Sequence, residues 1–278
     1  AQIDPSVCPN IHQLSQEGCF FESHHPVFPS VTRINAASMV TGVNPGSHGL
    51  PGNTFVARDF DPGRVLSAME PELAAIASSG LPVLYTPTLQ EILSTVGLEY
   101  MAIGVGTSGN AYAHNPRGEE FGGATIHPEF SIPSSLHASL LGRFGEWPAE
   151  SIPNTNRYVH AMDIFLDFVL EEKNPDVALI WSSEPDKSQH AFGVGSLESC
   201  AALSQADVQF GRLLSYLETS PNHKNADVLV LSDHGYSTII ETVDIEEEMK
   251  RAGFHVGPGP EGVLVASNGG SALIYVGE

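Results

Sequence analysis

Apolar residues along this chain follow two patterns, helical spacing in some segments and short uninterrupted runs in others. Helical spacing bounded by glycine or polar residues predicts helices over Pro9 to Glu17, Thr32 to Gly42, 87–97, Arg157 to Glu172 and Leu197 to Thr219. Uninterrupted apolar runs of strand length predict strands over 98–106, 176–181 and 226–232. Helices and strands therefore alternate along much of the chain.

This alternation determines the fold class that we expect. Strands that are apolar at every position are typical of a mostly parallel sheet with helices on both faces. We therefore predict an α/β fold, a three-layer α/β/α sandwich that forms a single domain over residues 1–278. Residues 108–153 are rich in Gly, Pro and His, and we expect a small inserted cap there.

The chain is strongly acidic, with a formal net charge of −21 at pH 7. A surface of that charge repels nucleic-acid backbones, so we exclude nucleic acid as a structural partner. A small phosphorylated substrate would need a local positive centre, and a bound divalent metal is one. No apolar run is long enough to predict a transmembrane segment. The oligomeric state stays open, as does the disulfide state of Cys8, Cys19 and Cys200.

Two polar clusters follow predicted strands, at the sheet edge where α/β proteins bind ligands. Asp186 and His190 have a D-x-x-x-H spacing that lets a carboxylate and an imidazole reach one ion. Asp233 and His234 are adjacent and precede Gly235, which permits a sharp turn. Each cluster alone is also compatible with an ordinary solvated loop or turn. Together they favour a metal site with oxygen and nitrogen ligands, for which zinc is the first choice and manganese or iron the next.

Thr32 stands at the start of a predicted helix, where backbone amides and the helix dipole favour a phosphoryl oxygen. A hydroxyl beside a bound cation loses its proton near neutral pH, so Thr32 is a candidate nucleophile. The competing interpretation is that Thr32 is a plain N-cap.

The segments VFPSVTRINAASMVTGVNPGSHGLPGN, EPDKSQHAFG and LSDHGYS, in this order, resemble the alkaline phosphatase superfamily. Across nearly the whole chain, the sequence is most similar to the type I phosphodiesterase/nucleotide pyrophosphatase family. In that family the nucleophilic threonine precedes an active-site asparagine by 21 positions, the separation of Thr32 and Asn53 here. The resemblance implies that Thr32 is the nucleophile and that Asn53 donates to a phosphoryl oxygen. It further implies that one zinc is held by Thr32, Asp233 and His234 and the other by Asp186 and His190.

The same resemblance implies a metal-dependent hydrolase that cleaves phosphodiester or pyrophosphate bonds through a covalent phosphothreonine. Trp181 occupies the place of a base-stacking aromatic residue, although a core tryptophan is an equal alternative. Arg33 stands where relatives usually have an aromatic residue, and it suits a phosphate or substrate carboxylate. Three alternatives stay open: a phosphomonoesterase, a phosphonoacetate-type hydrolase, and a non-catalytic binding module.

Two of the family's metal ligands would fall outside this sequence, an aspartate before Ala1 and a histidine after Gly277. The resemblance therefore implies a domain cut at both ends, with each zinc one ligand short. Among the other histidines, His48 is expected to order the loop that carries Asn53, and His127 in the expected cap is a candidate substrate contact. The acidity and the habits of the family favour a secreted or periplasmic protein.

Overall fold

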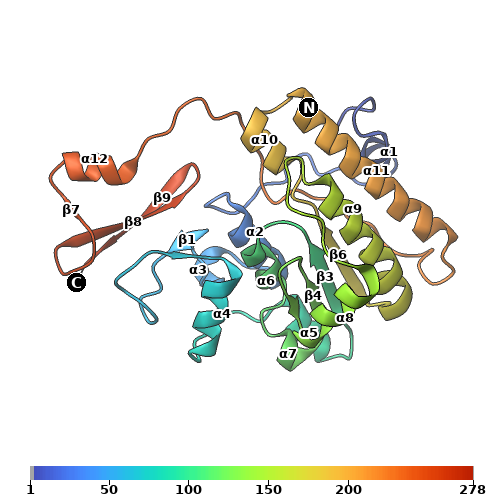
Figure 1. Cartoon of the computed structure of the whole chain (residues 1–278), viewed down its shortest axis with the longest axis horizontal. Coiled ribbons are helices and arrows are strands. Elements are labelled where there is room, and N and C mark those ends of the chain that lie inside the picture. The colour runs from blue at the N-terminus through green and yellow to red at the C-terminus, as the bar shows by residue number, and fades with distance from the viewer. Residues whose placement is uncertain (1–2, 278) are drawn as a thin grey trace.

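The computed structural model describes residues 3–277 and contains both helices and strands (Figure 1). The α-helices are α1 (Pro9–Glu17), α2 (Thr32–Thr41), α3 (Pro45–His48), α4 (Glu70–Ser78), α5 (Leu89–Ser94), α6 (Ser108–His114), α7 (Gly118–Phe121), α8 (Ser135–Phe144), α9 (Thr155–Ile164), α10 (Asp186–Phe192), α11 (Leu197–Thr219) and α12 (Ile245–Arg251). A π-helical stretch, η1 (Phe165–Lys173), continues α9. The strands are β1 (Thr54–Phe55), β2 (Leu66–Ser67), β3 (Tyr100–Gly104), β4 (Ala124–Ile126), β5 (Ser131–Ile132), β6 (Val177–Trp181), β7 (His255–Val256), β8 (Gly262–Asn268) and β9 (Ser271–Val276).

The central sheet has four strands in the order β5-β4-β3-β6. β3 is parallel to both β4 and β6, and β5 joins β4 in the antiparallel sense. Side chains of β3 alternate between two cores: Met101 and Ile103 pack with α8, α9 and η1, whereas Tyr100 and Ala102 pack toward α2 and α5. Helices thus cover both faces of a mostly parallel sheet, and the predicted three-layer α/β/α class is confirmed.

Local signals set the ends of the helices that matter for the site. α2 runs from Thr32 to Thr41 and stops at Gly42, whose φ of 70° is left-handed and suits glycine. α11 begins after Ser196, whose hydroxyl accepts a hydrogen bond from the Ser199 N–H. The predicted helices 9–17 and 197–219 agree with α1 and α11, and the predicted strand 176–181 agrees with β6.

The predicted strand over 226–232 is wrong. These residues form no strand, and Leu229 is 80% exposed. They run as an extended coil past α10 towards α12 and a separate three-stranded sheet of order β7-β8-β9 (Figure 1). An apolar run specifies the side chains that a strand would bury, but a strand also needs a neighbour with free backbone groups, and none of the described strands pairs with this segment.

Two further segments differ from expectation. Asp186 and His190, which the sequence alone also allowed in a solvated loop, lie on α10, and the helix predicted over Arg157 to Glu172 is divided into α9 and η1. Residues 108–153, expected as a cap, supply β4 and β5 to the central sheet and the buried helix α6 to its α2 side. A covering role for the rest of that segment stays a prediction.

Among residues 3–277, no helix is long and apolar enough to cross a membrane. Within residues 3–277, Cys8, Cys19 and Cys200 form no disulfide, and Cys8 is buried.

Candidate active site

Thr32 is the first residue of α2 and faces a histidine that lies 202 positions away in the sequence. Val31 occupies the N-cap position with extended backbone angles, and no side chain caps this helix. Thr32 Oγ1 instead lies 3.1 Å from Nε2 of His234. The N-cap interpretation of Thr32 is therefore wrong, and its hydroxyl is directed toward the predicted partner.

The hydrogen bonds of His234 determine which ring nitrogen can accept a proton. Nδ1 lies 2.9 Å from the carbonyl oxygen of Gly235, and because a carbonyl oxygen only accepts, Nδ1 carries the proton. Nε2 is the ring nitrogen that faces the Thr32 hydroxyl. Asp233 Oδ2 lies 3.4 Å from the same Nε2. Thr32 Oγ1 and Asp233 Oδ2 thus both approach His234 Nε2.

Asn53 is held beside Thr32 by the backbone at the start of α2. Its side-chain oxygen accepts a hydrogen bond from the Arg33 N–H at 3.0 Å, so its NH₂ group remains the donor side of the amide. The Arg33 guanidinium donates to the Asn53 carbonyl oxygen at 2.9 Å and to Thr107 Oγ1 at 3.3 Å. Burial lowers the pKa of Arg33 from its ordinary value. Arg33 therefore links the Asn53 loop to the start of α2, and a substrate contact for it stays a prediction.

The loop that holds Asn53 is itself ordered by His48, which is fully buried. The Leu50 N–H donates to His48 Nδ1 at 3.2 Å, so Nε2 carries the proton and faces Ser38 Oγ at 3.0 Å. Desolvation lowers the pKa of His48 to about 4. His48 has the loop-ordering contacts that the sequence led us to expect.

Asp186 begins α10 and His190 lies one turn later, with Asp186 Oδ1 3.6 Å from His190 Nε2. His190 Nδ1 lies 2.9 Å from the hydroxyl of Tyr236, three residues after Asp233. Desolvation raises the pKa of Asp186, and the charges of His190, His234 and Asp233 also act on it. Asp186 is thus near enough to Asp233 and His234 for their charges to act on it, and a single site that includes both clusters stays a prediction.

Sequence reasoning missed two side chains that fix the start of α10. Glu184 is only 8% exposed, and its two carboxylate oxygens accept from the Asn154 N–H at 2.9 Å and the Ser188 N–H at 3.0 Å. Asn154 in turn donates to Ser183 Oγ at 3.1 Å. The sequence shows an acidic residue two positions before Asp186, but it does not show that this residue is buried and bonded to the backbone of residue 154.

Trp181 and His127, the remaining candidate substrate contacts, lie apart from the polar clusters. Trp181 ends β6, is half-buried, and meets the ring of His114 edge-on at a centroid distance of 5.3 Å. His127 is only 1% exposed: Glu129 N–H donates to its Nδ1, and its Nε2 lies 3.1 Å from the Gly106 carbonyl oxygen. The structure does not bring His127 to the surface of the site, because both ring nitrogens are engaged within the chain.

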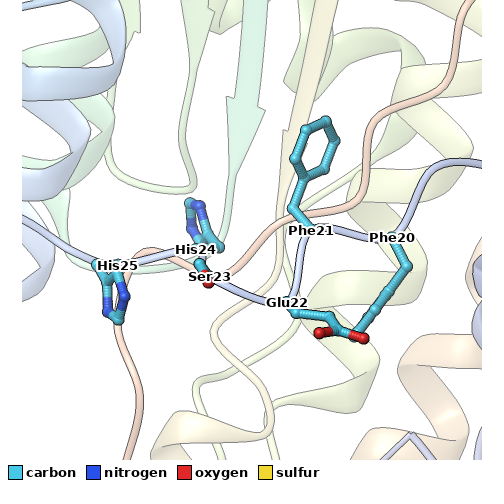
Figure 2. Close-up of a pocket in the computed structure, with 6 residues that line it drawn as sticks. All are labelled: Phe20, Phe21, Glu22, Ser23, His24 and His25. Atoms are coloured by element: carbon cyan, nitrogen blue, oxygen red, sulfur yellow. The ribbon is translucent and has the colours of Figure 1, made fainter.

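An open hollow lies against the loop that leads into Asp233. It has a volume of about 560 Å³, is lined by residues 20–25, and is joined to that loop by His24, whose Nε2 lies 3.0 Å from the Ser232 carbonyl oxygen. Figure 2 shows that Phe20 and Phe21 point to opposite sides of the backbone. Both rings are exposed, and the candidate residues Asp233 and His234 are not part of the lining of this hollow.

The donor atoms suit a divalent metal in kind. Asp186 Oδ1 and Asp233 Oδ2 are buried without a hydrogen-bond partner, a costly state for a carboxylate oxygen unless a cation is close. Neighbouring ligands of a tetrahedral zinc ion with bonds of about 2 Å lie roughly 3.3 Å apart. The separations of 3.1, 3.4 and 3.6 Å given above are close to that value. Within residues 3–277, however, no three His, Cys, Asp or Glu side chains gather as one metal-holding group, so each set is incomplete in number.

Comparison with known proteins places this site in context. A family model described as type I phosphodiesterase / nucleotide pyrophosphatase matches residues 2–277. The chain is 27% identical over 235 residues to a venom phosphodiesterase of Macrovipera lebetinus, covering 84% of this chain and 24% of that protein. It is 25% identical over 230 residues to ectonucleotide pyrophosphatase/phosphodiesterase family member 3 of Mus musculus, covering 83% of this chain and 22% of that protein.

Two solved structures share the fold. Phosphonoacetate hydrolase from Sinorhizobium meliloti 1021 matches with a TM-score of 0.57 and 20% identity, over 78% of this chain and 49% of that one. Murine ectonucleotide pyrophosphatase / phosphodiesterase 5 matches with a TM-score of 0.52 and 15% identity, over 76% of this chain and 47% of that one. The chain spans about a quarter of the length of these curated relatives and about half of these solved chains.

Proposed function

Because the chain belongs to the type I phosphodiesterase / nucleotide pyrophosphatase family, we propose that it hydrolyses small phosphoric esters, with phosphodiester or pyrophosphate bonds as the preferred substrates. The observation that carries this proposal is the contact of 3.1 Å between Thr32 Oγ1 and His234 Nε2 at the start of α2. It directs a hydroxyl away from the helix that it begins and into the cluster of carboxylates and imidazoles.

In this proposal Thr32 Oγ1 attacks phosphorus in line, forming an O–P bond as the bond to the leaving oxygen breaks. The Asn53 NH₂ group donates to a nonbridging phosphoryl oxygen, since the side-chain oxygen Oδ1 already accepts from the Arg33 N–H. The positive end of α2 favours the same oxygen. Water then attacks the phosphothreonine, releases the product and restores the Thr32 hydroxyl.

Two zinc ions belong to the proposal, with manganese or iron as less favoured occupants. Thr32, Asp233 and His234 would hold one ion, and Asp186 and His190 the other. When bound, such ions would lower the pKa of the nucleophile and stabilise negative charge at phosphorus and on the leaving oxygen. The support for them is the pair of buried carboxylate oxygens without partners and the separations close to a tetrahedral edge.

A second candidate keeps the same core but acts on a phosphomonoester or a phosphonate that carries a carboxylate. It is favoured by Arg33, a half-buried cation at the start of α2, and by the fold shared with phosphonoacetate hydrolase. Relatives named as venom and ectonucleotide enzymes support an extracytoplasmic setting for either activity.

The experiment compares wild type, Thr32→Ser and Thr32→Ala on a nitrophenyl phosphodiester and a nitrophenyl phosphomonoester, with zinc supplied. We expect the diester to be preferred, the serine variant to keep part of kcat, and the alanine variant to lose several orders of magnitude. Preference for the monoester would favour the second candidate. Wild-type protein inactive on both esters would favour a non-catalytic binding module, and full activity of Thr32→Ala would exclude Thr32 as the nucleophile.

A further inference from the structure

The segment that carries Asp233 and His234 has no regular secondary structure to hold it. Between α11 and α12, residues 220–244 contain no helix or strand. Backbone ladders therefore do not fix this segment, and its position beside the site depends on side-chain contacts. Those contacts include His24 with the Ser232 carbonyl oxygen and His234 with Thr32 of α2. Further along, Tyr236 and Thr238 meet α10 and the residues that follow it.

Tyr236 makes the closest of the contacts with α10. Its hydroxyl lies 2.9 Å from His190 Nδ1, and the two rings pack edge-on with centroids 4.6 Å apart. Thr238 adds a second attachment two residues later, where its Oγ1 accepts from the Val194 N–H at 3.0 Å. Desolvation, with a further contribution from the charge of Asp186, raises the pKa of Tyr236. The hydroxyl stays protonated near neutral pH and can either donate or accept.

The other ring nitrogen of His190 faces Asp186. Nε2 and Asp186 Oδ1 are 3.6 Å apart, too far for a good N–H···O hydrogen bond and close to the spacing of two ligands on one tetrahedral ion. Imidazoles that bind metals usually donate their second N–H to an acceptor, which fixes the tautomer and the direction of the ring. Tyr236 is in place to be that acceptor.

We propose that Tyr236 is a positioning residue: its hydroxyl accepts the Nδ1 proton of His190, which leaves the Nε2 lone pair for a divalent ion shared with Asp186. Because Tyr236 follows Asp233 by three residues, the same contact also sets the spacing between the two ligand pairs. This inference rests on the proposed metal-dependent function.

The test removes the hydroxyl and keeps the ring, in Tyr236→Phe. Tyr216→Phe is the matched control, since Tyr216 also packs against a histidine ring, at 5.6 Å from His223, but its hydroxyl donates to Glu171 on the protein surface. Zinc affinity of the full chain is measured by competition with a chelating indicator. Far-UV circular dichroism checks that both variants are folded.

We expect Tyr236→Phe to weaken zinc binding by about 10- to 100-fold and Tyr216→Phe to leave it unchanged. In ¹⁵N spectra of the zinc-loaded protein, His190 should keep its proton on Nδ1, and loss of the tyrosine hydroxyl should speed exchange of that proton with water. Wild-type affinity in Tyr236→Phe, with wild type itself binding zinc, would overturn the inference and leave the proposed function standing. Absence of zinc binding by wild type would overturn both.

Discussion

Substitution of Asn53 separates the structural and chemical roles that the structure gives to one side chain. Asn53→Ala removes the acceptor of the Arg33 N–H, one of the amides at the start of α2 that has no partner within the helix. The expected cost is about 1 kcal/mol of unfolding free energy, as for loss of a helix cap. The same change removes the NH₂ donor, so kcat should fall by about 10²- to 10³-fold if that donor meets a nonbridging oxygen in the transition state.

Asn53→Asp is the discriminating variant, because it keeps the acceptor and replaces the donor with a second acceptor. The carboxylate also lies near the positive end of α2, so stability should equal or exceed that of wild type. Activity should nevertheless fall at least as far as in the alanine variant, since a carboxylate repels the phosphoryl group. Urea unfolding and steady-state kinetics on one ester measure both quantities. An aspartate variant with wild-type kcat would refute the donor role of Asn53.

Two further predictions concern the packing beneath the site. A Cβ on Gly109 of α6 would lie 1.7 Å from the Ala68 carbonyl oxygen, so Gly109→Ala should destabilise the fold by about 3 kcal/mol. The control is Gly142→Ala in α8, where a Cβ meets nothing within 4 Å and should stabilise the helix by about 0.5–1 kcal/mol. Equal melting temperatures for this pair would contradict the close approach of α6. His114 is fully desolvated and its pKa is lowered to about 4, so its neutral form contributes stability that is lost as pH falls from about 6.5 to 4. The unfolding free energy should fall by roughly 3 kcal/mol between pH 7 and pH 4 in wild type, and by less in His114→Gln. An unfolding free energy that is equal at the two pH values in wild type would contradict this prediction.

Sequence patterns predicted the parts of this protein that depend on neighbours in the chain. α1 and α11 follow helical spacing and local stop or cap signals, and β6 follows an apolar run. The run over 226–232 has the same character as β6 but forms no strand, because pairing depends on a partner that the run itself does not encode.

The candidate site also has contacts that the sequence predicted and contacts that it did not. The resemblance to the family implied that Thr32 and His234 would share one metal, and the two side chains do meet, across 202 positions. The contacts of Glu184 with residue 154 and of Tyr236 with His190 exist only once distant segments are brought together, so no local pattern marked them. His127 illustrates the opposite limit: a histidine in a polar, glycine-rich segment looked accessible, but tertiary packing buries it.

The stereochemical course at phosphorus tests the covalent mechanism most directly. A phosphorothioate diester of known configuration is hydrolysed by the wild-type chain in ¹⁸O-labelled water, and the configuration of the product is determined. Attack by Thr32 followed by attack of water comprises two in-line displacements, so the account predicts net retention. Net inversion would show that water attacks phosphorus directly, and it would contradict a phosphothreonine intermediate.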